Sequence, residues 1–280
     1  MKLKAYGKVN ISLDVVGKRE DGYHLLRMIM QTVDIYDELI FEKCEEGIHI
    51  TCDKEFVPTD KRNLVYKAIE LFNTTYKVQG GVKVHINKNI PVEAGMAGGS
   101  TDAAAALKGI RDLYVPSVSD KELMELGVKI GADVPYCILG GTALCEGIGE
   151  VITPLKPFHN KILVVVKPNF GVSTVAVYKA FDINSIEKHP NTENLIDAMG
   201  KDNVVYVANN MMNLLENVTI RKHEEIQHIK DYMEKEGSLG AMMSGSGPTV
   251  FGFFEDMLTA QRCYEKLKDK YKEVFITRTI

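Results

Sequence analysis

The sequence has no surplus of basic residues. Among its 280 residues, 34 are Lys or Arg and 38 are Asp or Glu, which gives a formal net charge of −4. A general nucleic-acid binder needs a dense cationic footprint to neutralise phosphates, so this composition argues against that class. With 45% hydrophobic and 26% charged residues, the chain also falls outside the disordered and fibrous classes. If it handles phosphates, it must do so with a local group of residues.

Paired cysteines and long apolar runs are also missing. The five cysteines include no C-x-x-C pair, which argues against a zinc knuckle or a thioredoxin motif and predicts reduced thiols. The segment 1–10 lacks the apolar core of a signal peptide, and no stretch approaches the run of about 18 apolar residues that spans a bilayer. We therefore expect a cytoplasmic protein that binds neither a membrane nor nucleic acid.

The hydrophobic pattern predicts two α+β halves, residues 1–155 and 156–280, with prolines Pro154 and Pro157 marking the boundary. In the first half, β-forming residues dominate up to about residue 55, and helical spacing and strand alternation follow. The expected elements there are strands at 2–16, 28–44 and 82–86 and helices at 63–76, 100–114 and 119–130. The second half has the order β-α-β-β-α-β, which is typical of a ferredoxin-like sheet.

The strongest motif is the glycine-rich segment 91–102, which precedes an alanine run. Small residues allow the backbone N–H groups to approach an anion, and the start of the following helix adds unpaired N–H groups and a positive dipole end. Ser100 and Thr101 offer hydroxyls to a phosphate oxygen or a magnesium ion. The alternative is a glycine-rich turn that only caps a tightly packed helix. Walker, G-x-G-x-x-G and protein-kinase motifs are absent.

A second glycine cluster, Ser244-Gly245-Ser246-Gly247, lies between two expected strands. A hairpin turn needs only one or two glycines, so we favour a second anion-facing loop over a plain turn.

Three polar positions are candidates for chemistry. Asp133 follows a helix in a small-residue turn ahead of an apolar segment expected to be a strand, and a kinase needs such a carboxylate to orient or deprotonate its acceptor hydroxyl. Lys8 and Asn10 share one face of the first strand, where a lysine could stabilise phosphoryl charge. Two of them also have a simpler interpretation: Asp133 as a mobile surface aspartate, and Lys8 as an exposed lysine on an edge strand.

The dipeptide Tyr23-His24 closes the charged turn at 18–23. The tyrosine ring offers a stacking face and the imidazole offers both a donor and an acceptor, a combination suited to a planar base. A solvent-exposed turn explains the same residues equally well.

Together these motifs resemble the GHMP kinases, a family of small-molecule kinases. The match rests on residues 5–10, 91–105 and 244–249, and it extends over further segments from residue 5 to about residue 254. The resemblance implies a two-domain fold: an N-terminal α/β domain like domain 2 of ribosomal protein S5, a C-terminal ferredoxin-like domain, and an active site in the cleft between them. The segment 17–24 is most similar to family members that act on a cytidine diphosphate conjugate.

The resemblance implies ATP-dependent phosphorylation of the 2-hydroxyl of a methylerythritol moiety, in the non-mevalonate synthesis of isoprenoid precursors. It also implies Mg2+ as a cofactor, for which the sequence does not identify the protein ligands. It implies Lys8 and Asp133 as catalytic residues. The implied ATP-binding residues are Asn63, Lys88, Pro91, Gly95, Met96, Ala97, Gly98, Gly99, Ser100 and Thr101. The implied substrate-binding residues are Asn10, Tyr23, His24, Ile148 and Thr174, and Ser244, Gly245, Ser246 and Gly247 would close the active centre.

The family pattern is not matched everywhere. Glu93 stands where the family usually has Gly or Ala, and its side chain is expected to turn to solvent or to pair with Lys88. Glu122 is a candidate metal ligand, and a capping box explains its position equally well. Two alternatives remain open: another GHMP kinase, acting on mevalonate, homoserine or a sugar, and a catalytically silent nucleotide-binding relative. The oligomeric state is not predicted.

Overall fold

The computed structural model describes residues 1–280, and the chain forms two compact units. The first unit comprises residues 1–7, 35–90 and 97–140, and the second comprises residues 8–34, 91–96 and 141–280. These units differ from the expected segments 1–155 and 156–280. The physical reason is the length of the first two strands, β1 (Lys2–Lys18) and β2 (His24–Cys44), because each contributes residues to both units.

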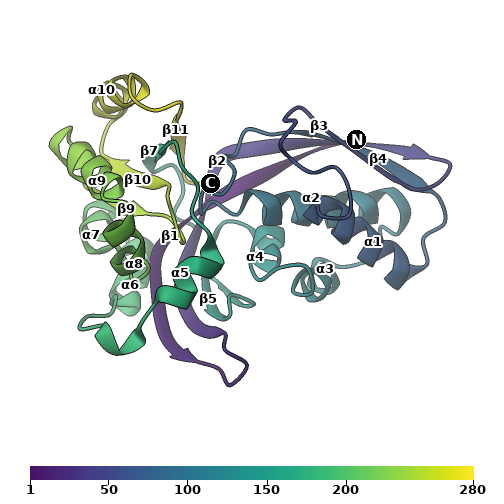
Figure 1. Cartoon of the computed structure of the whole chain (residues 1–280), viewed down its shortest axis with the longest axis horizontal. Helices are drawn as coiled ribbons and strands as arrows, with labels where there is room; N and C mark the ends of the chain where they lie inside the picture. The colour runs from purple at the N-terminus through teal and green to yellow at the C-terminus, as the bar shows by residue number, and fades with distance from the viewer. The chain divides into compact units, whose positions relative to one another are not determined.

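The first unit is a layer of strands covered on one face by helices (Figure 1). Strand β4 (Gly81–Asn87) runs antiparallel to the second half of β2. Strand β3 (Ile48–Cys52) lies parallel to β4 at the edge of the sheet. The helices are α1 (Leu64–Tyr76), α2 (Gly98–Tyr114), α3 (Asp120–Gly127) and α4 (Val134–Leu139). Their apolar faces and the strands form one buried core that includes Phe41 and Phe72.

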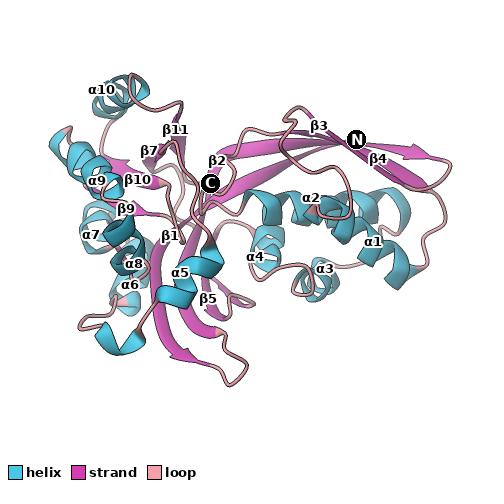
Figure 2. Ribbon diagram, viewed as in Figure 1, coloured by secondary structure: helices cyan, strands magenta, loops and turns pink.

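The second unit contains a four-stranded antiparallel sheet in the order β11-β7-β10-β9 (Figure 2). Its strands are β7 (Ile162–Lys167), β9 (Gly240–Met243), β10 (Val250–Phe254) and β11 (Glu273–Arg278). Helices α9 (Glu225–Lys235) and α10 (Met257–Lys268) pack on it. The expected ferredoxin-like order is therefore confirmed. The first and last of the four strands in sequence, β7 and β11, lie beside each other, and the sheet is antiparallel throughout.

The rest of the second unit includes the second half of β1 and the first half of β2. Strand β5 pairs with β2 and with β6, and β8 pairs parallel to β1. These strands are β5 (Thr142–Gly147), β6 (Val151–Pro154) and β8 (Met212–Asn213). The crossover between β7 and β9 holds α5 (Thr174–Ala180), α6 (Thr192–Gly200), α7 (Val204–Asn210) and α8 (Glu216–Lys222), with a short 3-10 turn at Ile183–Ser185.

One expected element is wrong. The apolar pattern after Asp133 predicts a strand, but this segment forms the short helix α4, and the strand β5 begins only at Thr142. A short apolar run fits a buried strand or a buried helix equally well, and here Pro135 in the first turn favours the helix. No helix of the chain combines the length and the apolar character needed to cross a membrane.

Candidate functional site

The glycine-rich segment is divided between the units: residues 91–96 belong to the second unit, and residues 97–101 begin α2 in the first. Ala97 occupies the N-cap position with a positive φ of 59°, and no side chain caps the helix. No acidic residue lies in the first turn either. The backbone N–H groups at the start of α2 therefore lack side-chain partners and carry the positive end of the helix dipole, which is the arrangement that binds anions.

The two hydroxyls at this helix start are not equivalent. Thr101 Oγ1 donates a hydrogen bond to the carbonyl of Tyr6 at 2.6 Å, so its proton is already used within the first unit. Ser100, which is half-buried, is the hydroxyl left at the helix start. Ser100 is therefore the better candidate for a phosphate oxygen or a magnesium ion.

Asp133 lies in the same unit, in the turn that leads into α4. It is the N-cap residue, yet its carboxylate does not cap the helix, and the residue is half-buried. A Cβ placed on Gly131 would lie 4.0 Å from Ser100 Oγ, so this turn approaches the start of α2. The first unit thus brings the turn that carries Asp133 next to Ser100 at the start of α2.

Two predicted nucleotide residues of the first unit have side chains that are engaged within the protein. Asn63 caps α1: its Oδ1 accepts from the Val65 N–H at 2.8 Å, and its Nδ2 donates to the Pro58 carbonyl at 2.6 Å. The ammonium of Lys88 is held by the carboxylates of Asp37 and Asp102. No motif or spacing pointed to Asp37, which lies 51 residues from Lys88 along the chain.

The second unit buries Lys8 and Asn10 together. Lys8 is 4% exposed and donates from Nζ to Asn10 Oδ1 at 2.7 Å, which confirms that the two residues share a face of β1 and excludes an exposed edge lysine. The Lys8 N–H donates to the carbonyl of Met96 at 3.2 Å, which ties the glycine-rich segment to β1. A Cβ on Gly245 would lie 3.5 Å from Lys8 Nζ.

The second glycine cluster is therefore part of this group. Ser244 Oγ donates to the carbonyl of Gly95 at 3.0 Å, and Ser246 Oγ lies 2.8 Å from Thr174 Oγ1. The side chain of Glu93 lies against Gly171, where an added Cβ would be 2.4 Å from Glu93 Oε2. Within this unit, the lysine, both glycine-rich segments and the threonine at the start of α5 lie in one neighbourhood.

The predicted base-recognition pair occupies the turn between β1 and β2. Tyr23 is 61% exposed, so its ring is open for stacking. His24 stacks on Tyr178, with ring centroids 5.3 Å apart, and meets the edge of Phe181 at 5.9 Å. Burial lowers the pKa of His24, and the charge of Lys18 lowers it further. A neutral imidazole that keeps one donor and one acceptor is what recognition of a base edge requires.

No motif in the sequence singles out Tyr178 and Phe181, the two rings that contact His24. The only available signal was their spacing of three residues on the expected helix, which places both rings on one face. Ile148 was predicted, and it lies in the turn between β5 and β6, where its N–H donates to Glu150 Oε2 at 2.6 Å.

The chain contains no group of three or more His, Cys, Asp or Glu residues that could hold a metal ion. Glu122 forms a capping box with Ser119, which accounts for its position. Magnesium in kinases is bound through few protein oxygens together with substrate phosphates. The helix start with Ser100 fits an ion that is bound together with the nucleotide.

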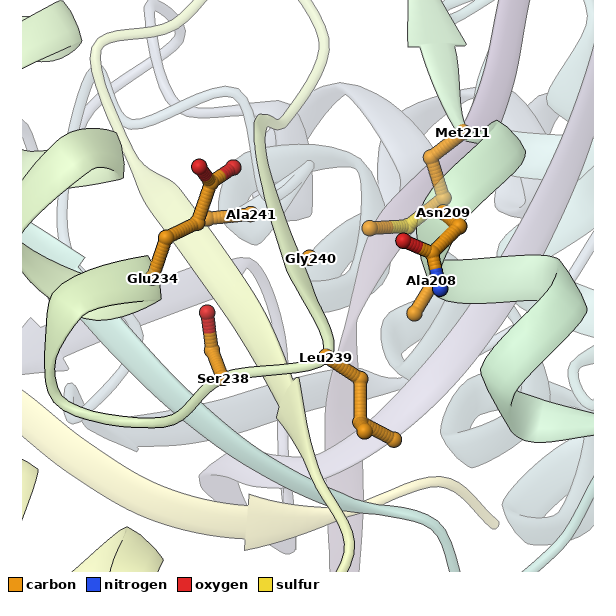
Figure 3. A pocket seen from close by; sticks show the side chains of 8 residues that line it. All are labelled: Ala208, Asn209, Met211, Glu234, Ser238, Leu239, Gly240 and Ala241. Carbon is orange, nitrogen blue, oxygen red and sulfur yellow. The ribbon is translucent and has the colours of Figure 1, made fainter.

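A separate pocket of about 330 Å³ opens in the second unit between the end of α7, the end of α9 and β9 (Figure 3). Asn209, Glu234 and Ser238 are its polar lining residues. None of the predicted site residues lines it, so the predicted chemistry does not take place there.

Two family models match the chain: the GHMP kinases N terminal domain over residues 63–141 and the GHMP kinases C terminal domain over residues 195–273. Among curated proteins, 4-diphosphocytidyl-2-C-methyl-D-erythritol kinase of Clostridium botulinum (strain Eklund 17B / Type B) is 62% identical over 100% of both chains. The protein of the same name from Clostridium perfringens (strain ATCC 13124) is 64% identical over 100% of this chain and 98% of that one.

The comparison with solved structures also finds kinases of this family. A crystal structure of 4-(cytidine 5'-diphospho)-2C-methyl-D-erythritol kinase covers 100% of this chain and 99% of its own, with a TM-score of 0.86 and 31% identity. A homoserine kinase from Cytophaga hutchinsonii has a TM-score of 0.80 at 20% identity, over 99% of this chain and 93% of that one, and shows the fold alone.

Proposed function

Because the chain belongs to the GHMP kinase family, and within it to the 4-diphosphocytidyl-2-C-methyl-D-erythritol kinases, we propose that it phosphorylates the 2-hydroxyl of that substrate with ATP. The products are the 2-phosphate and ADP, in the non-mevalonate synthesis of isoprenoid precursors. The observation that carries the proposal is an identity above 60% over the full length of curated relatives.

The nucleotide is assigned to the start of α2 and the segment that precedes it. The uncapped N–H groups of the first turn and the Ser100 hydroxyl support this assignment, since they offer donors and a positive dipole end to the phosphates. ATP supplies the phosphoryl group, and Mg2+ would be held by the phosphates together with Ser100. The full set proposed for ATP is Asn63, Lys88, Pro91, Gly95, Met96, Ala97, Gly98, Gly99, Ser100 and Thr101.

The proposed catalytic residues are Asp133 and Lys8. Asp133 orients or deprotonates the acceptor hydroxyl, a role supported by its half-burial in the turn whose Gly131 approaches Ser100. Lys8 stabilises the charge of the transferring group, supported by its burial beside Asn10 and Gly245. Because phosphoryl transfer passes through a loose transition state, positioning and charge stabilisation account for most of the catalysis.

The cytidine end of the substrate is assigned to Tyr23 and His24. Tyr23 stacks on the base with its exposed ring, and the neutral His24 reads the base edge. Asn10, Ile148 and Thr174 are proposed as further substrate contacts, and Ser244, Gly245, Ser246 and Gly247 as the segment that closes over the ligands. We place the reaction in the cytoplasm, where the five free cysteines stay reduced.

A coupled assay of ADP release tests the proposal directly. Release should require 4-diphosphocytidyl-2-C-methyl-D-erythritol, and mevalonate, homoserine or a sugar should not replace it. Turnover with one of these acceptors but not with the cytidine conjugate would assign the chain to another GHMP activity. Nucleotide binding without turnover of any acceptor would indicate a silent relative.

A further inference from the structure

Lys88 lies in a buried group of three charged residues within the first unit. The side chains of Lys88, Asp37 and Asp102 are 5%, 0% and 7% exposed. Lys88 Nζ donates to Asp37 Oδ2 and, at 2.9 Å, to Asp102 Oδ2. The ammonium that the family resemblance assigns to the nucleotide therefore already donates to two carboxylates.

Asp37 anchors the group on β2. Besides the bond from Lys88, its Oδ1 accepts from the backbone N–H groups of Asn89 at 2.6 Å and Ile90 at 2.8 Å. Both carboxylate oxygens are satisfied, so Asp37 holds the segment that follows β4 to the neighbouring strand.

Asp102 connects the same ammonium to α2. It lies within the first turns of the helix, and its Oδ1 is buried without a partner, so the bond to Lys88 is the interaction that holds this carboxyl group. Lys88 also packs directly under the helix start, since a Cβ on Gly98 would lie 3.3 Å from its Nζ. The ammonium thus joins β2 to the helix turn that carries the proposed phosphate-binding N–H groups.

We propose that Lys88 is a positioning residue for the nucleotide phosphates, which fixes the first turn of α2 through Asp37 and Asp102 and does not itself contact ATP. The inference rests on the proposed kinase function. A direct contact would require the ammonium to leave two buried carboxylates, whereas a fixed helix start needs no such rearrangement. Lys88 belongs to the ATP site through the backbone that it holds in place.

The test compares Lys88→Met, Asp102→Asn and the double variant Lys88→Met/Asp102→Asn. Binding of a non-hydrolysable ATP analogue and, separately, of cytidine diphosphate is measured by calorimetry without any acceptor turnover. Lys88→Met leaves two buried carboxylates without a counter-ion, so analogue affinity should fall by about 10-fold or more while cytidine diphosphate affinity changes by less than about 2-fold. Adding Asp102→Asn removes one of the unpaired charges and should restore analogue affinity to within about 3-fold of the parent.

A matched control is Lys108→Met on the same helix. Lys108 Nζ donates to the carbonyl of Ile138 at 2.6 Å, so its loss should lower thermal stability without weakening analogue binding.

Two results would overturn the proposal. If the double variant binds the analogue no better than Lys88→Met, then Lys88 contacts the nucleotide directly. If Lys88→Met binds it as the parent does, Lys88 does not position the helix start. Should Lys88→Met fail to fold, the affinity of the double variant for the ATP analogue is compared with that of Asp102→Asn. Affinities that agree within about 3-fold support positioning, and an affinity about 10-fold or more lower in the double variant contradicts it. Parent turnover of the cytidine conjugate, assayed separately, decides the proposed function itself.

Discussion

Ser244 donates a hydrogen bond from Oγ to the carbonyl oxygen of Gly95 at 3.0 Å, which joins two glycine-rich segments that lie 149 residues apart in the chain. The contact depends on the absence of a side chain at Gly95. A Cβ there would lie 2.1 Å from the Ser244 carbonyl oxygen, and Gly95 has a φ of +72°, which disfavours any other residue. The two segments therefore fit together only through a glycine.

Gly95→Ala should separate these segments. We expect the free energy of unfolding to fall by about 1–3 kcal/mol from overpacking, and the KM for ATP to rise because the phosphate segment is displaced. Thermal denaturation and steady-state kinetics measure the two effects. Gly200→Ala is the matched control, since no atom lies within 4 Å of its added Cβ and its φ is not positive. Equal stability of the two variants would contradict the close packing.

Asp133→Asn should abolish most turnover. Removing a group that orients or deprotonates the acceptor costs about 10²- to 10⁴-fold in kcat. Binding of a non-hydrolysable ATP analogue should stay close to that of the parent, because the backbone N–H groups of α2 are unchanged. The exposed Asp269→Asn serves as the control. A kcat within a few fold of the parent would remove Asp133 from the catalytic role.

Tyr23→Ala should weaken recognition of the cytidine end. Base stacking contributes about 1–3 kcal/mol, so the KM for the cytidine substrate should rise by about 5- to 150-fold while the KM for ATP stays constant. Tyr23→Phe keeps the ring and should keep the KM. An unchanged KM in Tyr23→Ala would contradict the stacking assignment.

Lys18→Gln should raise the pKa of His24, because the lysine charge is one of the two causes that lower it. A folded-state pKa below the ordinary value means that the neutral ring is favoured in the native protein. The contribution of His24 to the stability of the fold is thus complete above the ordinary pKa of histidine, and it is lost as the pH falls through the pKa of His24 in the folded state. An NMR titration of His24 in the parent and in Lys18→Gln measures the shift. Lys18→Arg retains the charge and should leave the titration unchanged.

We expect the ionisation of Asp102 to change the stability of the fold with pH in the opposite direction. Burial raises the pKa of its carboxyl well above the usual range, Lys88 opposes this shift, and Asp37 adds to it. The folded state therefore binds this proton more tightly than the unfolded chain does, so its contribution to stability is present below the ordinary pKa of about 3.9 and is lost as the pH rises through the folded value. Asp102→Asn cannot ionise and should flatten this part of the profile, measured by urea unfolding at about pH 5 and about pH 8. Parallel profiles for parent and variant would exclude this titration.

The sequence alone was sufficient for features that depend on neighbours along the chain. The uncapped, glycine-rich start of α2 follows from local residue types, and so does the turn between β1 and β2 that presents Tyr23 and His24. The ferredoxin-like sheet was also predictable, because its strands have regular spacing and turn residues. The pairing of Lys8 with Asn10 required only the two-residue period of a strand.

Only the tertiary structure decided where the charged side chains point. A lysine near a phosphate loop is expected to face the phosphates, yet Lys88 turns inward, because the fold brings Asp37 within reach from a strand 51 residues earlier. Short apolar segments were ambiguous for a related reason: α4 is a helix because Pro135 and its buried neighbours favour one, whereas its sequence fits a strand equally well. Local residue types therefore determined which groups this protein carries, and long-range packing determined which of them remain available to a ligand.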